Sequence, residues 1–505
     1  MIEFLKQEDN MKTHYVTKLN NKKRINLNYI SSLKFLSVVM VGLFFGANSL
    51  LAQEVWTLQR CINEALKNNL TLQSGEISKN NAAITVKQAE QARYPNLNAG
   101  TNVGFNFGRT VDPTTNQFIQ QTFFSNNYNL TSGVTIFNGF RIHNTIKQAN
   151  IDAKIAVTNQ QQTERNIILD VSSAYLNALF SNENLTISKN NLDITAIQLD
   201  MLSRMIKAGT RPDNDIFETE AQFAQNEQAV VTAENNQNLA LLRLKQLMNV
   251  EMNVDVNVAA SVDVGTLTDP ISIDLNQLIQ LGQANQPSIK ALELGIQSSA
   301  FGVKIAEARR YPTVGVNINL ISNYSNKGFA ITSVEQGIVN RNLIVNNTPV
   351  VVGFPTEFPT FTKQAYNTQL QDNLSYGFGV GVQMPIYANH NIKGGIDRAN
   401  LQVENAQINL KAEKQRVNAT VQQAYIDAKA AKSSLAASEK SLTAQKNAYD
   451  AAVKRLEAGA INTFDLNTVK TRLDIANLNF VNAKYDYIFR SKVLDFYLGK
   501  KITMN

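Results

Sequence analysis

The sequence predicts an α+β membrane protein in which very long helices continue into β-strands, and these strands close a barrel only together with strands of further copies. Three observations predict this fold class. The chain contains an internal duplication, it has helical patterns far longer than those of ordinary globular proteins, and it has four segments in which large apolar residues alternate with small polar ones.

The first 52 residues predict a signal peptide for export. The run FLSVVMVGLFFGANSLLA at 35–52 is apolar and ends in small residues, so Gln53 is the expected start of the mature chain. A membrane anchor is the alternative, but the uninterrupted apolar core covers only about a dozen residues, short of the roughly 20 that a bilayer helix needs. Met1 and Met11 are both candidate starts. Basic residues precede the apolar run at Lys18, Lys22, Lys23, Arg24 and Lys34.

The charge and residue inventory excludes several function classes. The formal net charge of +7 falls to 7 − 4 = +3 without the first 52 residues, which hold seven Lys/Arg and three Asp/Glu, so we expect no nucleic-acid partner. The single cysteine, Cys61, excludes an internal disulfide framework. His143 and His390 are the only histidines after residue 52, and no phosphate loop, nucleophile elbow or metal-ligand spacing is present. We therefore expect no enzyme activity, cofactor or metal.

The duplication divides the mature chain into two structural repeats, 53–273 and 274–505. Residues 58–95 match 275–312 without gaps, and the matching blocks end in ARYP and RRYP. The later block IFNGFRIHNTIKQAN at 136–150 matches IYANHNIKGGIDRAN at 386–400. Each repeat is predicted to contain a helix, a β-hairpin, a long helix, a tip turn and a return helix. The hairpins are expected at 97–137 and 313–385, the tip turns at 209–213 and 459–463, a linker before 274 and a C-terminal tail at the end.

The helical segments follow a 3.6-residue period on a narrow, Ala-rich stripe. Because no proline interrupts 141–211 or 386–505, helices of about 65 residues and about 100 Å are allowed. Shorter return helices are expected at about 213–248 and 463–498. Such lengths are typical of coiled-coil packing, and polar residues on several faces suit helices that surround a water-filled space.

Four segments show a period of two, and the clearest is 374–384, where large apolar residues alternate with Ser, Gly and Gln. The other three lie around 102–107, 128–136 and 314–320. Almost no charge occurs on the polar face, as is typical of transmembrane β-strands rather than of a soluble sheet. The 33-residue difference between the two offsets (250 − 217) places a longer loop in the second hairpin, near 325–373, which is expected to face outside the cell.

Four strands cannot close a barrel, and an open sheet edge in lipid would leave backbone groups unpaired. The chain is therefore expected to oligomerise, with eight strands in a dimer, twelve in a trimer or sixteen in a tetramer. A periplasmic coiled-coil scaffold with a soluble β-domain is the alternative from another class, and recovery without detergent would favour it.

The order of the repeat, the ARYP and RRYP junctions, the IFNG junction and two Ala-Gly turns resembles the TolC-like outer-membrane efflux protein family, over essentially the whole mature chain. The resemblance implies a homotrimer with a 12-stranded β-barrel, four strands per chain, in outer-membrane lipid, continuous with a periplasmic α-helical barrel. It also implies an exit duct of a tripartite export system that binds a periplasmic adaptor (membrane fusion protein) and an inner-membrane transporter. A duct for type I protein secretion stays open as an alternative, as does the substrate.

The two tip turns hold the candidate site residues. The resemblance implies a pore gate at Asp465 and, in the first repeat, at Asp215. The family's second acidic position is Thr468 here, and the usual partners of Asp215 are replaced by Leu456 and Ile461, with Arg211 and Arg455 nearby. Both acids also fall in the first turn of a helix, where the helix dipole alone favours them. The adaptor is expected to contact Gly209, Thr210, Arg211, Gly459, Ala460 and Ile461.

Overall fold

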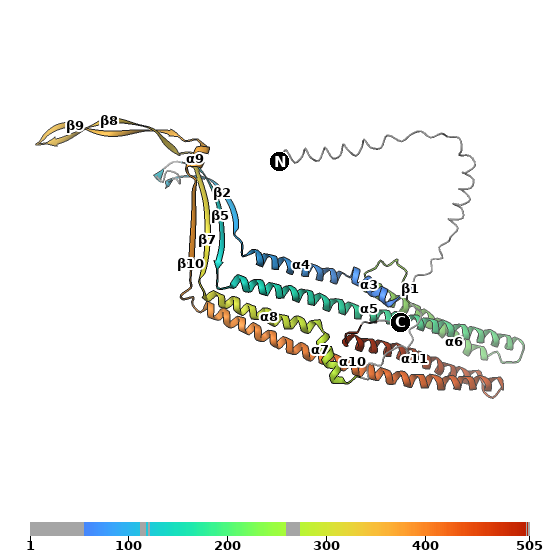
Figure 1. Ribbon diagram of the computed structural model, residues 1–505. Helices are drawn as coiled ribbons and strands as arrows, with labels where there is room; N and C mark the ends of the chain where they lie inside the picture. Colours follow the sequence, from blue (N-terminus) through green and yellow to red (C-terminus); the bar gives the residue numbers. More distant parts are fainter. Residues whose placement is uncertain (1–54, 112–117, 120–121, 259–272, 501, 503–505) are drawn as a thin grey trace, which may run out of the picture. The chain divides into compact units, whose positions relative to one another are not determined.

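The computed structural model describes residues 55–111, 118–119, 122–258, 273–500 and 502 (Figure 1). The predicted signal peptide at 1–52 and most of the predicted linker before 274 lie outside these residues. Residues Trp56–Asn505 form one compact unit, and the division into two repeats at 273/274 stays a prediction.

The first half of this unit runs from helix to strand and back to helix (Figure 1). Its longest element is α5, 67 residues from Arg141 to Lys207, which confirms the expected long helix. The return helix α6 spans Asp215–Met248. The other elements are β1 (Val55–Trp56), α3 (Leu58–Asn68), α4 (Leu70–Gln91), β2 (Asn96–Asn106), β3 (Thr110–Val111), β4 (Phe118–Ile119), β5 (Phe123–Phe137) and β6 (Asn257–Val258).

The second half repeats this order with a longer insertion between its strands. Its long helix α10 spans Asn391–Glu457, again 67 residues, and is followed by the return helix α11 at Thr463–Tyr497. The remaining elements are α7 (Leu275–Asn285), α8 (Pro287–Glu307), η3 (Ala308–Arg310), β7 (Thr313–Ser325), β8 (Phe329–Val345), β9 (Thr348–Lys363), α9 (Tyr366–Asp372) and β10 (Ser375–Gln383).

The four predicted strands form one antiparallel sheet in the order β10-β7-β5-β2. The helices α4, α5, α8 and α10 join the four strands at one end of this sheet, while the connections within each hairpin lie at the opposite end (Figure 1). Strands β2 and β10 are its two edges and have no further partner among the described residues.

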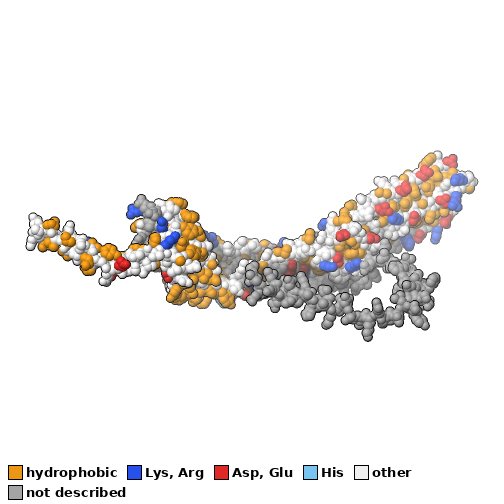
Figure 2. Space-filling model, turned by 90° about the horizontal axis from the view of Figure 1, so that it is seen from above, with side chains coloured by type: hydrophobic (Ala, Val, Ile, Leu, Met, Phe, Trp, Pro, Cys, Tyr) orange, Lys and Arg blue, Asp and Glu red, His pale blue; other side chains and the backbone are white. Residues whose placement is uncertain are grey.

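The register of the sheet places its large apolar side chains on one face. Cross-strand partners share a face, and Leu320 pairs with both Leu130 and Tyr376, while Val316 pairs with both Val134 and Val380. On the opposite face Asn319 lies between Thr131 and Gly377. The alternation expected from the sequence therefore produces one mainly apolar and one mainly polar face, with Ser132 and Asn126 of β5 as polar residues on the apolar face. Hydrophobic side chains gather over this region in Figure 2.

The prediction of a long loop near 325–373 is wrong, because most of this segment has regular secondary structure. Strands β8 and β9 form a two-stranded antiparallel ribbon that is separate from the main sheet, and α9 follows it. The ribbon closes through Asn346 and Asn347, whose φ angles are +51° and +61°. Two left-handed residues in a two-residue loop are typical of a type I′ hairpin turn, which Asn tolerates better than most residues do.

The helical part has its largest core where α3, α5, α6 and α11 meet. Tyr175 and Leu179 of α5 and Leu244 of α6 are almost fully buried there, together with Ile488 of α11. The hydroxyl of Tyr175 donates to the carbonyl oxygen of Trp56 at 3.0 Å. Cys61 is buried in the same core as a free thiol, and burial raises its pKa to about 12. No helix of the described chain is long and apolar enough to cross a bilayer.

The IFNG and RRYP motifs meet at the junction of strands and helices. Gly139 has a φ of +66°, and a Cβ built there would lie 2.7 Å from the carbonyl oxygen of Ala308 and 2.8 Å from Cβ of Tyr311. Only glycine fits both the backbone angle and this close approach. The two motifs are thus two sides of one packing contact between the halves of the chain.

Candidate functional site

The two tip turns end the long helices in the same way. In the first, the N–H of Gly209 donates to the carbonyl of Ile206 at 2.8 Å, and the N–H of Thr210 donates to the carbonyl of Met205 at 3.0 Å. In the second, Gly459 and Ala460 make the corresponding bonds to Leu456 and Arg455 at 3.0 and 2.8 Å. This double bond pattern is the Schellman motif, which satisfies carbonyl groups at a helix end.

Both turns require glycine because of the positive backbone φ angle, and not because a side chain would collide with a neighbouring atom. The φ angles are +69° at Gly209 and +67° at Gly459, and a Cβ at either position would meet no atom within 4 Å. Since residues with a Cβ adopt this region at a cost, the Ala-Gly pairs are the stop signals of the two long helices. The predicted left-handed glycines are confirmed.

The two acids beyond the turns differ in their surroundings. Asp465 is the third residue of α11, and its N–H donates to the Oδ1 atom of the N-cap residue Asn462 at 2.8 Å. Asp215 is the first residue of α6, whose N-cap Asn214 makes no side-chain cap bond. Both acids lie in the first helical turn, as expected. Although each follows its turn glycine by six residues, Asp215 is the first residue of its helix and Asp465 is the third.

The carboxylates also differ in their partners. The Asp215 carboxylate lies 3.8 Å from a guanidinium nitrogen of Arg211, and both side chains are about one-third exposed. Asp465 is exposed and takes part in no ion pair among the described residues. Asp215 therefore has Arg211 as an ion-pair partner within its own turn, whereas the Asp465 carboxylate is exposed and has no ion-pair partner among the described residues.

The six residues expected at the adaptor contact lie on the surface of the tips. Gly209, Thr210, Gly459 and Ala460 are exposed, and the other two, Arg211 and Ile461, are half-buried. Within the described part of one chain, no hydrogen bond or ion pair joins the first turn to the second. The fold places the two turns at the same end of the helical part (Figure 1), so the gate and adaptor assignments stay predictions.

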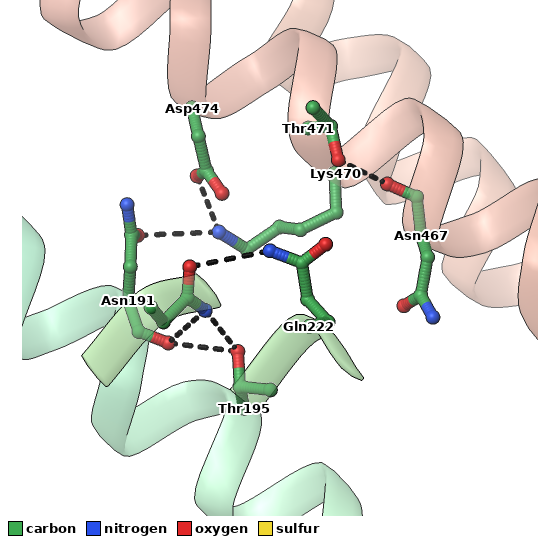
Figure 3. Close-up of polar contacts among 8 residues, drawn as sticks. Asn191, Thr195, Gln222, Asn467, Lys470, Thr471 and Asp474 are labelled. Atoms are coloured by element: carbon green, nitrogen blue, oxygen red, sulfur yellow. Dashed lines mark hydrogen bonds and ion pairs between the residues drawn. The ribbon is translucent and has the colours of Figure 1, made fainter. Parts of the chain in front are cut away.

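A polar network deeper in the tip region joins the two halves of the chain (Figure 3). The ammonium group of Lys470 in α11 donates to Oδ1 of Asn191 in α5 at 3.2 Å, and it forms an ion pair with Asp474 one turn further along α11. The Lys470 side chain is only 13% exposed. Burial raises the pKa of the Asp474 carboxyl above its usual value, and the hydrogen bond from Lys470 opposes this shift.

The same network extends into α6. The amide nitrogen of Asn226 donates to the Thr195 hydroxyl at 2.7 Å, and Gln222 donates to Oδ1 of Asn226 at 3.2 Å. The backbone carbonyl of Asn191 accepts a longer bond from Asn226, 3.4 Å. Asn191 thus connects α6 to α11, because its backbone carbonyl accepts from Asn226 and its side-chain oxygen accepts from Lys470. Sequence reasoning missed this cluster, and the i,i+4 spacing of Lys470 and Asp474 is the signal that could have suggested a part of it.

Closer to the core, charged and aromatic groups fix the packing of α11. The hydroxyl of Tyr485 donates to Oε2 of Glu183 in α5 at 2.6 Å, and burial raises the pKa of that hydroxyl. Arg490 pairs with Asp427 of α10 at 2.7 Å. No group of His, Cys, Asp and Glu side chains in the described residues is arranged to hold a metal ion. His390 precedes α10 at the N-cap position and makes no side-chain cap bond.

Comparison with known proteins gives one consistent result. A family model described as outer membrane efflux protein matches residues 61–250 and 278–500. The outer membrane protein TolC of Vibrio cholerae is 22% identical over 444 residues, which is 87% of this chain and 90% of that protein. The outer membrane efflux protein BepC of Brucella suis is 19% identical over 438 residues, 87% of this chain and 84% of the relative. An uncharacterized protein of Haemophilus influenzae is 25% identical over 299 residues, only 61% of its length.

Solved structures share the fold at low sequence identity. The transmembrane channel protein CusC superposes with a TM-score of 0.69 at 13% identity, covering 88% of this chain and 92% of that chain. The open state of the outer membrane channel MtrE of Neisseria gonorrhoeae superposes with a TM-score of 0.65 at 15% identity, covering 88% and 89%. The architecture expected from the sequence, a β-barrel subunit continuous with long helices, is therefore confirmed.

Proposed function

The chain belongs to the outer membrane efflux protein family, and from that premise we propose that three copies form the exit duct of a tripartite export system. Membership places the chain in the outer membrane with its helices in the periplasm, and makes it a duct rather than an enzyme. The proposed duct carries substrate from an inner-membrane transporter, through the helical barrel and the β-barrel, to the outside.

The observation that carries the proposal is the four-stranded sheet. Its mainly apolar face extends over four strands that carry no charged residue, and its two edges, β10 and β2, have no partner among the described residues. An unpaired edge is not tolerated in lipid, so each edge must pair with another copy. Three copies supply twelve strands with an apolar outer face and a polar lumen, which is how an outer-membrane barrel is built.

The helical part supports the same proposal. The long helices α5 and α10 end in matching turns, and Ala-rich stripes such as Ala424, Ala428 and Ala431 allow close packing. Many of the exposed side chains of these two helices are polar or charged, which suits a water-filled tunnel. We propose that the adaptor docks on the rim formed by the two tip turns.

We propose Asp465 as the principal gate residue. Its carboxylate is exposed and unpaired at the tip, so three copies around the threefold axis would focus negative potential on a narrow lumen and attract cations. Asp215 has a smaller role in this proposal because Arg211 offsets its charge. The efflux role is preferred over type I secretion because the family description and a curated relative both name efflux.

Fractionation of cells that express the full chain tests the proposal. The duct is expected in the outer-membrane fraction, released only by detergent, and cross-linked to an adaptor through residues of the tip turns. A cysteine introduced at Thr210 should cross-link, whereas one at exposed Lys440, away from the tip, should not. Recovery in a soluble periplasmic fraction without detergent would overturn the proposal.

A further inference from the structure

The ribbon of β8 and β9 is a two-stranded sheet that is not hydrogen-bonded to the four-stranded main sheet. It belongs to neither edge of the main sheet, and both of its faces are exposed. Val334, Ile338 and Ile344 are 49%, 71% and 78% exposed on one face, and Phe354 and Phe358 are exposed on the other. A lone two-stranded ribbon is marginally stable in water, so such a segment gains from a partner.

The prolines of β9 close one edge of this ribbon. Pro349, Pro355 and Pro359 pair with Ile344, Ile338 and Val334 without a register shift between them. Proline has no N–H and is tolerated in a paired strand only where the N–H would point away from the partner. All three therefore lie at outward-facing positions, and the outer edge of β9 lacks three of the donors that another strand would need.

The outer edge of β8 is open by the same geometry. In an antiparallel pair both residues of a non-hydrogen-bonded pair direct their N–H groups outward. The partners of the three prolines are even-numbered, so the even residues of β8 from 334 to 344 face outward, and none of them is proline. One edge of the ribbon is blocked and the other is a free template for one strand.

The sequence of β8 is complementary to itself across that free edge. Glu335 and Arg341 are the only charged residues of β8, they lie on the same face, and both are exposed and absent from the ion pairs of the described residues. If two β8 strands pair antiparallel with Ile338 opposite Ile338, Glu335 of each strand lies opposite Arg341 of the other. The same register sets Gln336 opposite Asn340 on the other face.

We propose that β8 is a homotypic docking edge, where two copies of this chain from different trimers pair their β8 strands around a twofold axis centred on Ile338. About ten backbone hydrogen bonds and two reciprocal Glu335–Arg341 ion pairs form at each contact. The charged residues occupy non-hydrogen-bonded pairs, where side chains approach most closely. The product is a four-stranded sheet β9-β8-β8-β9, whose outer edges both carry prolines and stop further growth.

The pairing must join different trimers, because an isologous contact needs a twofold axis and three ribbons cannot all pair within one threefold ring. Two trimers related by such axes can pair all three ribbons at once. The inference rests on the proposed function in one respect: the ribbon lies at the end of the sheet opposite the helices, which is the cell exterior if the helices are periplasmic. The contact is then an association of ducts outside the barrel.

The mass of the purified full-length protein in detergent, measured by light scattering across a concentration series, tests the inference. The wild-type chain is expected to show trimers in equilibrium with assemblies of six chains. Arg341→Glu and Glu335→Arg each set like charges opposite one another and are expected to weaken the association about tenfold or more. The double variant Glu335→Arg with Arg341→Glu restores opposite charges and is expected to restore the six-chain species.

Two further variants distinguish specific pairing at the β8 edge from nonspecific association of the ribbon. Glu357→Arg makes the same charge change on the proline-blocked strand β9 and is expected to leave the association unchanged. Ile338→Pro removes an outward-facing donor of β8 without touching the ribbon's own hydrogen bonds and is expected to abolish it. A wild-type chain that stays trimeric at every concentration, or a double variant that does not recover, overturns the inference. Single-channel conductance of the same samples tests separately whether the protein forms a duct. A failure of the β8 pairing can therefore be distinguished from a failure of the proposed function.

Discussion

The ammonium group of Lys470 lies 3.2 Å from the side-chain oxygen of Asn191, and this hydrogen bond joins α11 of the second half to α5 of the first (Figure 3). Lys470 also forms an ion pair with the half-buried carboxylate of Asp474. A lysine that is 13% exposed with two partners on different elements holds the two helical hairpins together near the tip. The two halves of the chain are thus joined by polar side chains there, and not only by the apolar core.

We expect Lys470→Met to destabilise the protein by about 1–3 kcal/mol, because it leaves the half-buried Asp474 carboxylate without its counter-ion and removes a charged hydrogen bond. Thermal unfolding followed by circular dichroism in detergent measures the change. Lys440→Met is the matched control: Lys440 is exposed on α10 and forms no ion pair in the described chain, so a change below about 0.5 kcal/mol is expected. Equal effects of the two substitutions would contradict the role of Lys470.

The free energy of unfolding should depend on pH through the protonation of the Asp474 carboxyl. Burial raises the pKa of this carboxyl above its ordinary value of 3.8, so the native state binds its proton more tightly than the unfolded state does. The resulting stabilisation is fully present below the unfolded pKa and is lost as pH rises through the native one. The melting temperature of wild type relative to Asp474→Asn should therefore rise as pH falls from about 7 to about 4. A difference that moves in the opposite direction would exclude this account.

The tip glycines are expected to resist substitution. Gly459→Ala forces a residue with a Cβ to φ +67° and should cost about 1–2 kcal/mol, although nothing lies near the new methyl group. Gly395→Ala is the control inside the long helix α10, which the Gly459 turn ends; a Cβ also meets nothing there but the φ is ordinary, so the substitution should stabilise by up to about 1 kcal/mol. Denaturant unfolding distinguishes the two signs. A neutral Gly459→Ala would mean that the turn adopts another conformation.

Neighbouring residues of β7 should differ sharply in their tolerance of charge. Ile318→Arg places a guanidinium on the apolar face, where a charge near the bilayer midplane costs about 2–4 kcal/mol. Asn317→Arg places the same group on the polar face, where it should leave folding intact and shift ion selectivity. The measurement is the fraction of protein that reaches the outer membrane as trimer. Equal loss for both variants would contradict the assignment of the two faces.

The gate assignment predicts a change in conduction. Asp465→Ala removes the exposed, unpaired carboxylate at the tip and should raise single-channel conductance and weaken blockade by multivalent cations. Asp215→Ala is the matched comparison: its carboxylate already faces Arg211, so the effect on blockade should be smaller. Identical traces for wild type and Asp465→Ala would remove this residue from the gate.

Periodic patterns sufficed for the long helices and the four main strands, because each pattern reports a face that is buried or lipid-exposed along its whole length. The ribbon of β8 and β9 escaped this reasoning, since both of its faces mix apolar and polar residues. The Asn346-Asn347 turn was the available signal.

The candidate site also contains both features that the local sequence predicted and features that depend on tertiary packing. The tip glycines followed from local sequence, because a Schellman turn is a local structure. The Lys470–Asn191 contact depends on how α11 and α5 align, and no local pattern contains that register. The difference between Asp215 and Asp465 arose from their caps: Asn462 caps α11 with its side chain, whereas Asn214 does not cap α6.

The most direct test of the central claim is single-channel recording of the purified full-length trimer in a planar bilayer. The account predicts stable, cation-selective conductance steps whose multivalent-cation blockade depends on Asp465. A correctly folded trimer that inserts into the bilayer and carries no current across the full voltage range, with Asp465 present or replaced by Ala, would contradict the claim that this chain forms a duct.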